Sequence, residues 1–357
     1  MRGKGINYDT GFFPAGRSSR EHFDADVVRS EMCVIARELR CTAVRISGGE
    51  PARLSTAAEL AAAEGLEVWF APFPCELAAY QLAPLFADCA ERAEHLRRTG
   101  ANVVLVTGCE LTLFGAGFLP GGTVYERIQG LQAGGQQLYA AFAALPGKLN
   151  DFLAATAEAA RSRFAGPLTY ASGMWEPVDW APFDIAATDA YRDASNAGTF
   201  RSELRKQLQH GKPLVVTEFG CCGYAGAGDR GGMGWAIIDV SSDPPRLDGE
   251  YVRDEAEQVR YLEELNAIFA EEGVDLAFWF TFAGYPLVHD SDPRRDLDMA
   301  SYGVVKMLPD RPGTADPGTG GRGRGYHGLG WEPKLAFAAL AGANGRAAPG
   351  RSDREPG

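Results

Sequence analysis

The chain has 357 residues, of which 45% are hydrophobic and 23% are charged, a balance typical of a globular protein with a large core. This composition excludes a disordered, collagen-like or disulfide-scaffold protein. The 47 acidic and 35 basic side chains give a net charge of −12, which argues against nucleic acid as a partner because such binders need clustered Lys and Arg. The length alone is compatible with two domains or with one large domain.

The termini and the cysteines indicate the compartment. The chain begins without an apolar run long enough for a signal peptide, and no stretch approaches the roughly 20 apolar residues needed to cross a membrane. Seven cysteines in no framework spacing predict free thiols. Cys221 and Cys222 are adjacent, but no C-x-x-C or His-rich partner accompanies them. We therefore expect a cytoplasmic protein with no membrane segment, no metal and no cofactor.

In the first half of the chain, short apolar runs alternate with amphipathic segments. The run at 102–107 is almost continuously apolar, as is typical of a strand in a parallel sheet that is covered on both faces. Strands are expected at 6–8, 42–46, 67–71 and 102–107, and helices at 24–40, at 56–65 with a capping box, and over a long segment that ends near residue 98.

The second half repeats the scheme. Strands are expected at 168–171, 184–188, 213–217 and 276–281, and helices at 149–164, 200–210, 251–272 and 331–341. Eight strands with intervening helices predict an α/β fold, a single (β/α)8 TIM barrel. An open doubly wound sheet is the alternative, although no glycine-rich phosphate fingerprint follows the first strand. Residues 1–341 are expected to form the barrel, and 342–357 a polar, disordered tail.

Three insertions interrupt the repeat, after strands four, seven and eight. The first, 111–146, contains a short helix near Thr123 and Glu126; the second is 221–249. The third, 308–330, is rich in Gly and Pro and is expected to be mobile. Long insertions in compact domains are usually lids or binding loops. The first two follow strands directly, which places them at the barrel mouth, where the active sites of such barrels lie.

Two glutamates lie at the ends of apolar strands. Glu110 follows the fourth strand in V-T-G-C-E-L, and Glu218 ends the seventh in V-V-T-E-F-G. A buried carboxylate is unfavourable by several kcal/mol unless it is paired, but at the carboxyl end of a barrel strand it faces the mouth. Strands four and seven lie on opposite sides of a small barrel. Two carboxyl groups across a cleft, one protonated and one ionised, are what glycosidic bond cleavage needs.

The order of these motifs resembles the clan-A retaining glycoside hydrolases, such as cellulases and β-mannanases, over residues 5–340. The resemblance implies that Glu218 is the nucleophile and Glu110 the acid/base. It implies that Arg45 in V-R-I lies beside the nucleophile and that Tyr191 hydrogen-bonds it. It also implies that Trp279 forms the floor of the sugar subsite.

Two positions depart from the pattern of these hydrolases. Cys109 stands where they usually place an Asn that bonds the sugar 2-hydroxyl, and Asp189 replaces the His of their His-x-Tyr motif. Cysteine is a poor hydrogen-bonding residue, whereas bonds to the 2-hydroxyl supply several kcal/mol at the transition state. A substrate that is modified or differently oriented there, or chemistry other than simple hydrolysis, is therefore expected.

Further substrate contacts are expected from residues in mouth-side loops. Trp175 offers a flat ring on which a sugar face can stack, as is typical of carbohydrate sites. Asp290 and Asp292 belong to an acidic loop after strand eight. They are candidates for binding a polar edge of the substrate, and a solvated, ion-paired loop is the alternative.

The sequence therefore predicts a retaining glycosidase that acts on a carbohydrate or a glycosylated small molecule. One alternative keeps the barrel and the glutamates but assigns a tailoring or transglycosylase reaction on a small glycosylated metabolite. The other is a non-catalytic barrel that binds sugars. Fold analogy alone does not separate the three.

Overall fold

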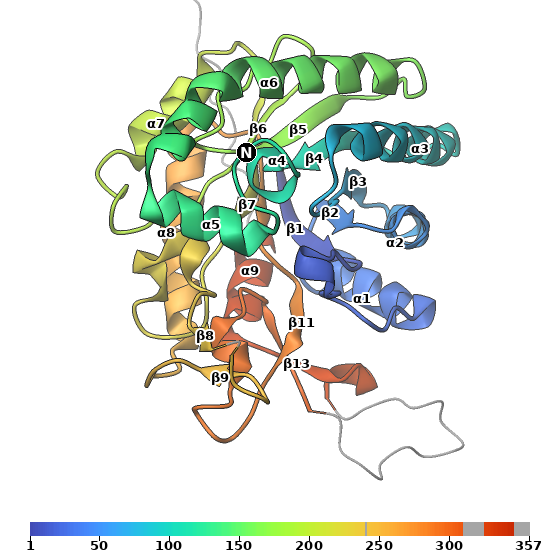
Figure 1. Ribbon diagram of the computed structural model, residues 1–357. Helices are drawn as coiled ribbons and strands as arrows, with labels where there is room; N and C mark the ends of the chain where they lie inside the picture. Colours follow the sequence, from blue (N-terminus) through green and yellow to red (C-terminus); the bar gives the residue numbers. More distant parts are fainter. Residues whose placement is uncertain (240, 310–324, 346–357) are drawn as a thin grey trace, which may run out of the picture.

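The computed structural model describes residues 1–239, 241–309 and 325–345. Eight parallel strands close into a barrel in the order β1-β10-β7-β6-β5-β4-β3-β2 (Figure 1), which confirms the predicted (β/α)8 fold. The barrel strands are β1 (Gly3–Asp9), β2 (Ala43–Gly48), β3 (Glu67–Pro72), β4 (Val103–Cys109), β5 (Leu168–Gly173), β6 (Ala186–Asp189), β7 (Leu214–Phe219) and β10 (Leu276–Trp279).

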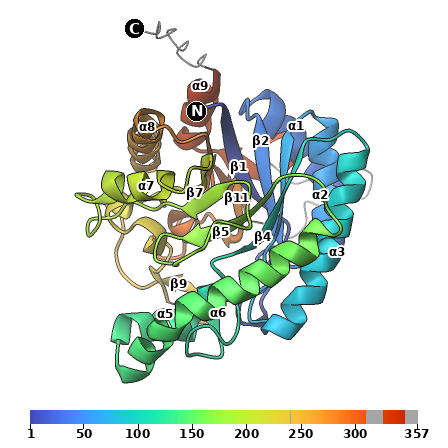
Figure 2. The same cartoon turned by 90° about the horizontal axis from the view of Figure 1, so that it is seen from above.

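Helices surround the barrel, as the view in Figure 2 shows. They are α1 (Ala25–Arg37), α2 (Pro51–Ala63), α3 (Ala79–Arg98), α6 (Gln136–Arg161), α7 (Phe200–Leu208), α8 (Glu255–Glu272) and α9 (Leu335–Gly345). Between β5 and β6 the chain crosses over 174–185 without a helix. Among the described residues, no helix has the length and apolar character needed to span a bilayer.

Several predicted boundaries were wrong, and the largest differences concern three helices. The helix α2 begins at Pro51 rather than at Thr56, because proline at the first helical position has a suitable φ and needs no partner for its missing N–H. The helix α6 begins at Gln136 and continues through Pro146, so much of the expected insertion is helical. Residues 331–333 form a strand, and the last helix begins only at Leu335.

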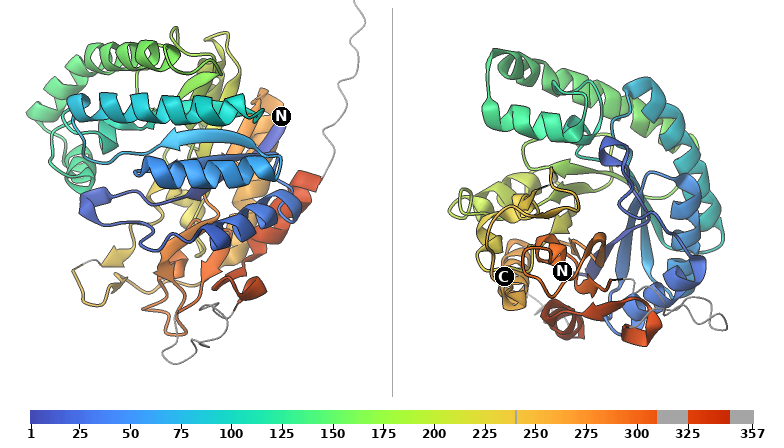
Figure 3. Two further views of the ribbon diagram at one scale, coloured as in Figure 1. Left: turned by 90° about the vertical axis from the view of Figure 1, so that its right-hand side faces the viewer. Right: turned by 60° about the horizontal axis from the view of Figure 1, so that its bottom comes forward.

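The insertions contain short elements on the mouth side. Thr123 and Glu126 form the predicted capping box at the start of α5, and Figure 3 shows this helix at the end of the barrel opposite the N-terminus. The additional elements are η1 (Pro14–Gly16), α4 (Leu111–Phe114), α5 (Val124–Ala133), η2 (Ala227–Asp229), η3 (Gly231–Met233), β8 (Ile238–Asp239), β9 (Arg246–Leu247), β11 (Ala283–Val288), η4 (Leu297–Ala300), β12 (Val305–Met307), η5 (Tyr326–Gly328) and β13 (Trp331–Pro333). Most of the predicted third insertion and of the predicted tail lies outside the described residues.

The barrel interior is packed with side chains rather than open. Trp69 on β3 and Phe278 on β10 meet edge to face, with their ring centroids 5.0 Å apart. A Cβ on Gly5 of β1 would lie 2.3 Å from the Phe278 ring, so only glycine fits there. The filled interior confines the space for a ligand to the mouth.

Glu31 of α1 joins the barrel to the segments that follow it. Its fully buried carboxylate accepts hydrogen bonds from four donors. The donors are the hydroxyl of Tyr8, the guanidinium of Arg20 at 3.2 Å, the hydroxyl of Tyr285 at 3.0 Å and the indole N–H of Trp331 at 3.1 Å. A single carboxylate thus links β1, α1, β11 and β13.

We predict that Glu31→Ala lowers the free energy of unfolding by about 3–5 kcal/mol, because it leaves the buried Arg20 guanidinium without its counter-charge. Urea unfolding followed by circular dichroism measures the change. Glu59→Ala, at an exposed position of α2, is the matched control and should change stability by less than about 0.5 kcal/mol. Equal stability of the two variants would contradict the role of Glu31.

Candidate functional site

The centre of the mouth is an ion pair between Glu218 on β7 and Arg45 on β2. Arg45 Nη1 donates to Glu218 Oε1 at 2.6 Å, and the hydroxyl of Tyr191 donates to Oε2 at 2.9 Å. The Arg45 side chain is fully buried, while 12% of the Glu218 side chain is exposed. Burial and the negative charge of Glu218 raise the pKa of Tyr191 well above its usual range, so its hydroxyl stays a donor. The carboxylate is therefore fixed through both oxygens, with a small surface open to the mouth.

Asn7 on β1 positions Arg45 and was missed in the sequence. Its Oδ1 accepts from Arg45 Nη1 at 2.7 Å, and its Nδ2 donates to the Thr217 carbonyl at 2.9 Å. Asn7 is fully buried. The signal was a lone amide inside the apolar run of the first strand, because a buried polar side chain requires partners.

Glu110 follows β4 in a left-handed backbone conformation, with φ of 41° and ψ of 47°. Such a conformation is unfavourable by about 1–3 kcal/mol for a residue other than glycine. It is held by the neighbouring backbone: the Glu110 N–H donates to the Ala171 carbonyl at 2.9 Å, and its carbonyl accepts from Leu113 and Phe114 at 2.8 and 2.9 Å. Backbone strain of this kind often marks a functional site.

The Glu110 carboxyl has surroundings opposite to those of Glu218. Burial raises its pKa well above the ordinary value, and the negative charges of Asp189 and Glu218 raise it further. Since Arg45 is hydrogen-bonded to Glu218, it only partly offsets this effect. Two carboxyl groups with such different surroundings can act as a proton donor and an ionised group at the same pH.

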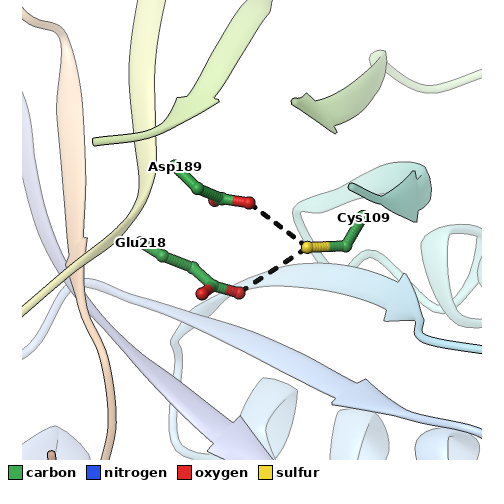
Figure 4. Close-up of side chains that lie close together, drawn as sticks. All are labelled: Cys109, Asp189 and Glu218. Carbon is green, nitrogen blue, oxygen red and sulfur yellow. Dashed lines mark hydrogen bonds between the residues drawn. The ribbon is translucent and has the colours of Figure 1, made fainter. Parts of the chain in front are cut away.

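Cys109 and Asp189 lie directly beside Glu218 (Figure 4). The Cys109 sulfur is 3.2 Å from Asp189 Oδ2 and 3.7 Å from Glu218 Oε1. Burial is the main cause that raises the pKa of both the thiol and the Asp189 carboxyl. Cys109 is therefore a neutral thiol that donates to the acids rather than a thiolate.

The same three side chains are the candidate metal ligands among the described residues. One donor atom from each lies within 4.8 Å of the others, and thiolate with carboxylates is a donor set that Zn²⁺ accepts. A metal ion would have to displace the thiol proton against the raised pKa of Cys109 and compete with Arg45 for Glu218 Oε1. These observations favour the hydrogen-bonded cluster, and the expected absence of a metal stays a prediction.

Glu176 is a second residue that the sequence did not reveal. Its buried carboxylate accepts from the Tyr170 hydroxyl at 2.8 Å and from the backbone N–H groups of Gly173 and Thr112, each at 3.0 Å. It thereby ties β5 to α4, the helix that starts next to Glu110. Tyr170 and Gly173 are close to Glu176 in the chain, but Thr112 is 64 positions away, and nothing in the loop sequence marks this link to α4.

The two tryptophans expected to contact a sugar differ in exposure. Trp175 is 46% exposed and donates from its ring N–H to Thr112 Oγ1 at 3.3 Å, so its ring is open at the mouth. Trp279 is fully buried and packs on Phe219, with the two ring centroids 5.4 Å apart. The prediction for Trp279 was therefore wrong. Side chains alternate along a strand, so Phe278 faces the barrel interior and Trp279 faces the surrounding helices.

Asp290 and Asp292 belong to a separate ion-paired turn. Arg295 lies 3.4 Å from the first and 3.5 Å from the second, and Asp290 Oδ1 accepts from the Asp292 N–H at 2.8 Å. Their carboxylates are thus engaged within their own loop. Within the described part of the chain, neither carboxylate pairs with a residue that contacts Glu110 or Glu218.

Comparisons with known proteins identify the fold. No protein-family model matches the chain, and no curated protein matches it. A GH113 β-1,4-mannanase structure superposes with a TM-score of 0.60 at 13% identity, covering 96% of this chain and 99% of the other. The chain thus shares the barrel fold of this glycoside hydrolase.

Two further structures agree. The GH113 β-mannanase from Alicyclobacillus acidocaldarius gives a TM-score of 0.57 at 17% identity, with 96% of each chain covered. The family 1 β-glucosidase from Thermotoga maritima gives 0.50 at 12% identity, covering 95% of this chain and 96% of the other. The predicted resemblance is confirmed as a shared fold across nearly the whole chain.

Asp189→Asn tests the electrostatics of the cluster. Since the pKa of Asp189 is raised in the folded state, the native protein binds a proton more tightly than the unfolded chain, and stability falls as pH rises from about 4 towards the native pKa. The variant should lose this slope, about 1.4 kcal/mol per pH unit, and be more stable than the wild type at pH 7. Urea unfolding from pH 4 to 8 measures it.

The control for this prediction is Asp151→Asn, at an exposed position of α6. This variant should follow the wild-type pH dependence. An Asp189→Asn protein whose stability falls with pH as steeply as the wild type would contradict the prediction.

Proposed function

We propose that the protein is a retaining glycosidase in which Glu218 is the nucleophile and Glu110 the acid/base. The observation that carries the proposal is the asymmetry of the two carboxyl groups. Glu218 is held by a guanidinium and a phenol, and Glu110 has a raised pKa at the end of another strand of the same mouth. The clan-A fold supports it.

The proposed reaction has two displacements at the anomeric carbon. In the first, a Glu218 oxygen forms a bond to this carbon while the bond to the leaving oxygen breaks, and Glu110 gives that oxygen its proton. In the second, Glu110 takes a proton from water, whose oxygen replaces Glu218 at the same carbon. The released sugar retains its configuration, and both glutamates return to their starting states.

We propose that the substrate is a carbohydrate or a glycosylated small molecule with a β-glycosidic bond. The structures to which the chain is similar include β-1,4-mannanases and a β-glucosidase. These names support a β-glycosidic linkage in the substrate. A transfer reaction is the second candidate. In such a reaction an acceptor hydroxyl replaces water in the second step. Cys109 stands where the resembled hydrolases usually have an amide for the sugar 2-hydroxyl, and its thiol donates to Asp189, which favours a substrate or a reaction different from simple hydrolysis.

Labelling of the nucleophile tests the proposal directly. A panel of 2-deoxy-2-fluoro β-glycosides with good leaving groups should trap the glycosyl-enzyme, and peptide mass spectrometry should find the adduct on Glu218. Glu218→Gln should give no adduct and reduce turnover by at least about 10³-fold. Glu263→Gln, exposed on α8, is the control and should label like the wild type. An adduct on a different residue would refute the assignment of the nucleophile.

The pH dependence tests the role of Glu110. A proton donor works only while protonated, so kcat/KM should fall as pH rises through the raised pKa of Glu110, well above the value of about 4.3 for an ordinary Glu. In Glu110→Gln this fall in kcat/KM with rising pH should vanish. Its kcat/KM should drop by about 10²–10⁴-fold for poor leaving groups and much less for dinitrophenyl glycosides. Equal losses for both kinds of leaving group would contradict an acid role.

A further inference from the structure

The insertions after β4 and β7 meet through two aromatic side chains. Tyr125 of α5 and Trp235, which follows η3, lie with ring centroids 6.0 Å apart at an interplanar angle of 60°. This is an edge-to-face contact in the favourable range. Tyr125 is 43% exposed and Trp235 is partly exposed, so the pair lies at a surface rather than in the core. We call these two residues the aromatic bridge.

The Tyr125 side of the bridge is fixed to the segment that carries Glu110. Arg127 of α5 is buried and donates to the carbonyls of Leu113 and, at 2.8 Å, Gly121. Glu76, in the loop after β3, accepts from the N–H of Val124 at 3.0 Å and from that of Ala15 in η1 at 3.0 Å. The helix α5 is thus attached to the loops that follow β1, β3 and β4.

The Trp235 side is fixed to the segment that holds Glu218. The preceding Gly234 donates to the Tyr302 hydroxyl at 2.9 Å and accepts from the Tyr224 hydroxyl at 2.9 Å. The Tyr302 ring lies 6.0 Å from the ring of Tyr191, whose hydroxyl bonds the Glu218 carboxylate. A Cβ on Gly232 would lie 3.3 Å from Tyr191. The loop therefore packs directly on the residue that supports the nucleophile.

Each half of the bridge is consequently built on the support of one glutamate, and the two halves belong to the insertions that follow the carboxyl ends of β4 and β7. We propose that the aromatic bridge closes one end of the cleft, so that the site is a pocket for the terminal residue of a glycoside. The inference rests on the proposed glycosidase function. On this proposal, the exposed ring of Trp175 borders the open side and contacts the leaving group.

The consequence for substrate choice is steric. An internal unit of a polysaccharide continues in both directions, so it needs a groove that is open at both ends. A pocket with one opening accepts a chain end or a small glycosylated molecule. The bridge therefore assigns the protein to exo-acting chemistry on short substrates.

Binding of end-blocked oligosaccharides tests the inference without turnover. The protein is the full chain with Glu218→Gln, and the ligands are β-1,4-linked manno- and gluco-pentaoses, free or with an acetal blocking the non-reducing end. Isothermal titration calorimetry should show that blocking weakens binding by at least about tenfold. In the double variant Tyr125→Ala, Trp235→Ala, free and blocked ligands should bind within about threefold of each other.

Two further variants make the test specific. Tyr139→Ala removes a tyrosine that is 74% exposed on α6. This variant keeps the aromatic bridge, so it should bind blocked ligands more weakly than free ones, as the parent does. Trp235→Phe keeps an aromatic ring and should retain most of the discrimination. The double variant should unfold at a temperature close to that of the parent. Its loss of discrimination between free and blocked ligands is then explained by an opened mouth and not by a lost fold.

The outcomes separate this inference from the proposed function. Equal binding of free and blocked ligands by the intact bridge overturns the inference alone, and so does continued exclusion of blocked ligands by the double variant. Binding of no oligosaccharide by any variant overturns the inference together with its carbohydrate substrate. The fluoroglycoside labelling of Glu218 then decides independently whether the glycosidase proposal itself stands.

Discussion

The ion pair between Arg45 and Glu218 is the constraint on which the rest of the mouth depends. A carboxylate and a guanidinium taken out of water are unfavourable by several kcal/mol unless each finds close partners. Asn7 holds the cation, and the pairing leaves the other acids of the mouth with little compensation for their charge. Burial is the main cause that raises the pKa values of Glu110 and Asp189, the neighbouring negative charges raise them further, and Arg45 offsets this only in part. The chemical distinction between two glutamates is therefore a property of the cluster.

The insertions belong to the same framework as the site. The segment that turns sharply at Glu110 continues into α4. There Glu176 accepts a hydrogen bond from the Thr112 N–H, and Arg127 donates one to the Leu113 carbonyl. The loop after β7 rests on Tyr191 through Tyr302. If the proposed function holds, changes in these insertions also affect the groups that orient the carboxylates, so substrate selectivity and reactivity share supporting residues.

Much of the fold and part of the site could be predicted from the sequence. Apolar strands that end in a carboxylate are unusual, and this signal singled out Glu110 and Glu218, whose catalytic roles stay a prediction. Asn7 was missed because its partners Arg45 and Thr217 come together only in the closed barrel, and Glu176 because its link to α4 depends on the distant Thr112. Trp279 was misassigned because one position along a strand decides whether a ring faces the interior or the helices. The face of the sheet that a strand-end side chain occupies depends on the register with the neighbouring strands. The local sequence pattern does not define that register.

The position of β1 between β2 and β10 affects how the chain matures during synthesis. One edge of β1 pairs with the nearby β2, but its other edge waits for Leu276–Trp279. Glu31 likewise waits for Trp331, which follows it by 300 positions. A ribosome that adds roughly 5–20 residues per second needs many seconds to deliver these partners. The barrel can therefore close only after most of the chain has been synthesised, because its first strand is also the pairing partner of its last.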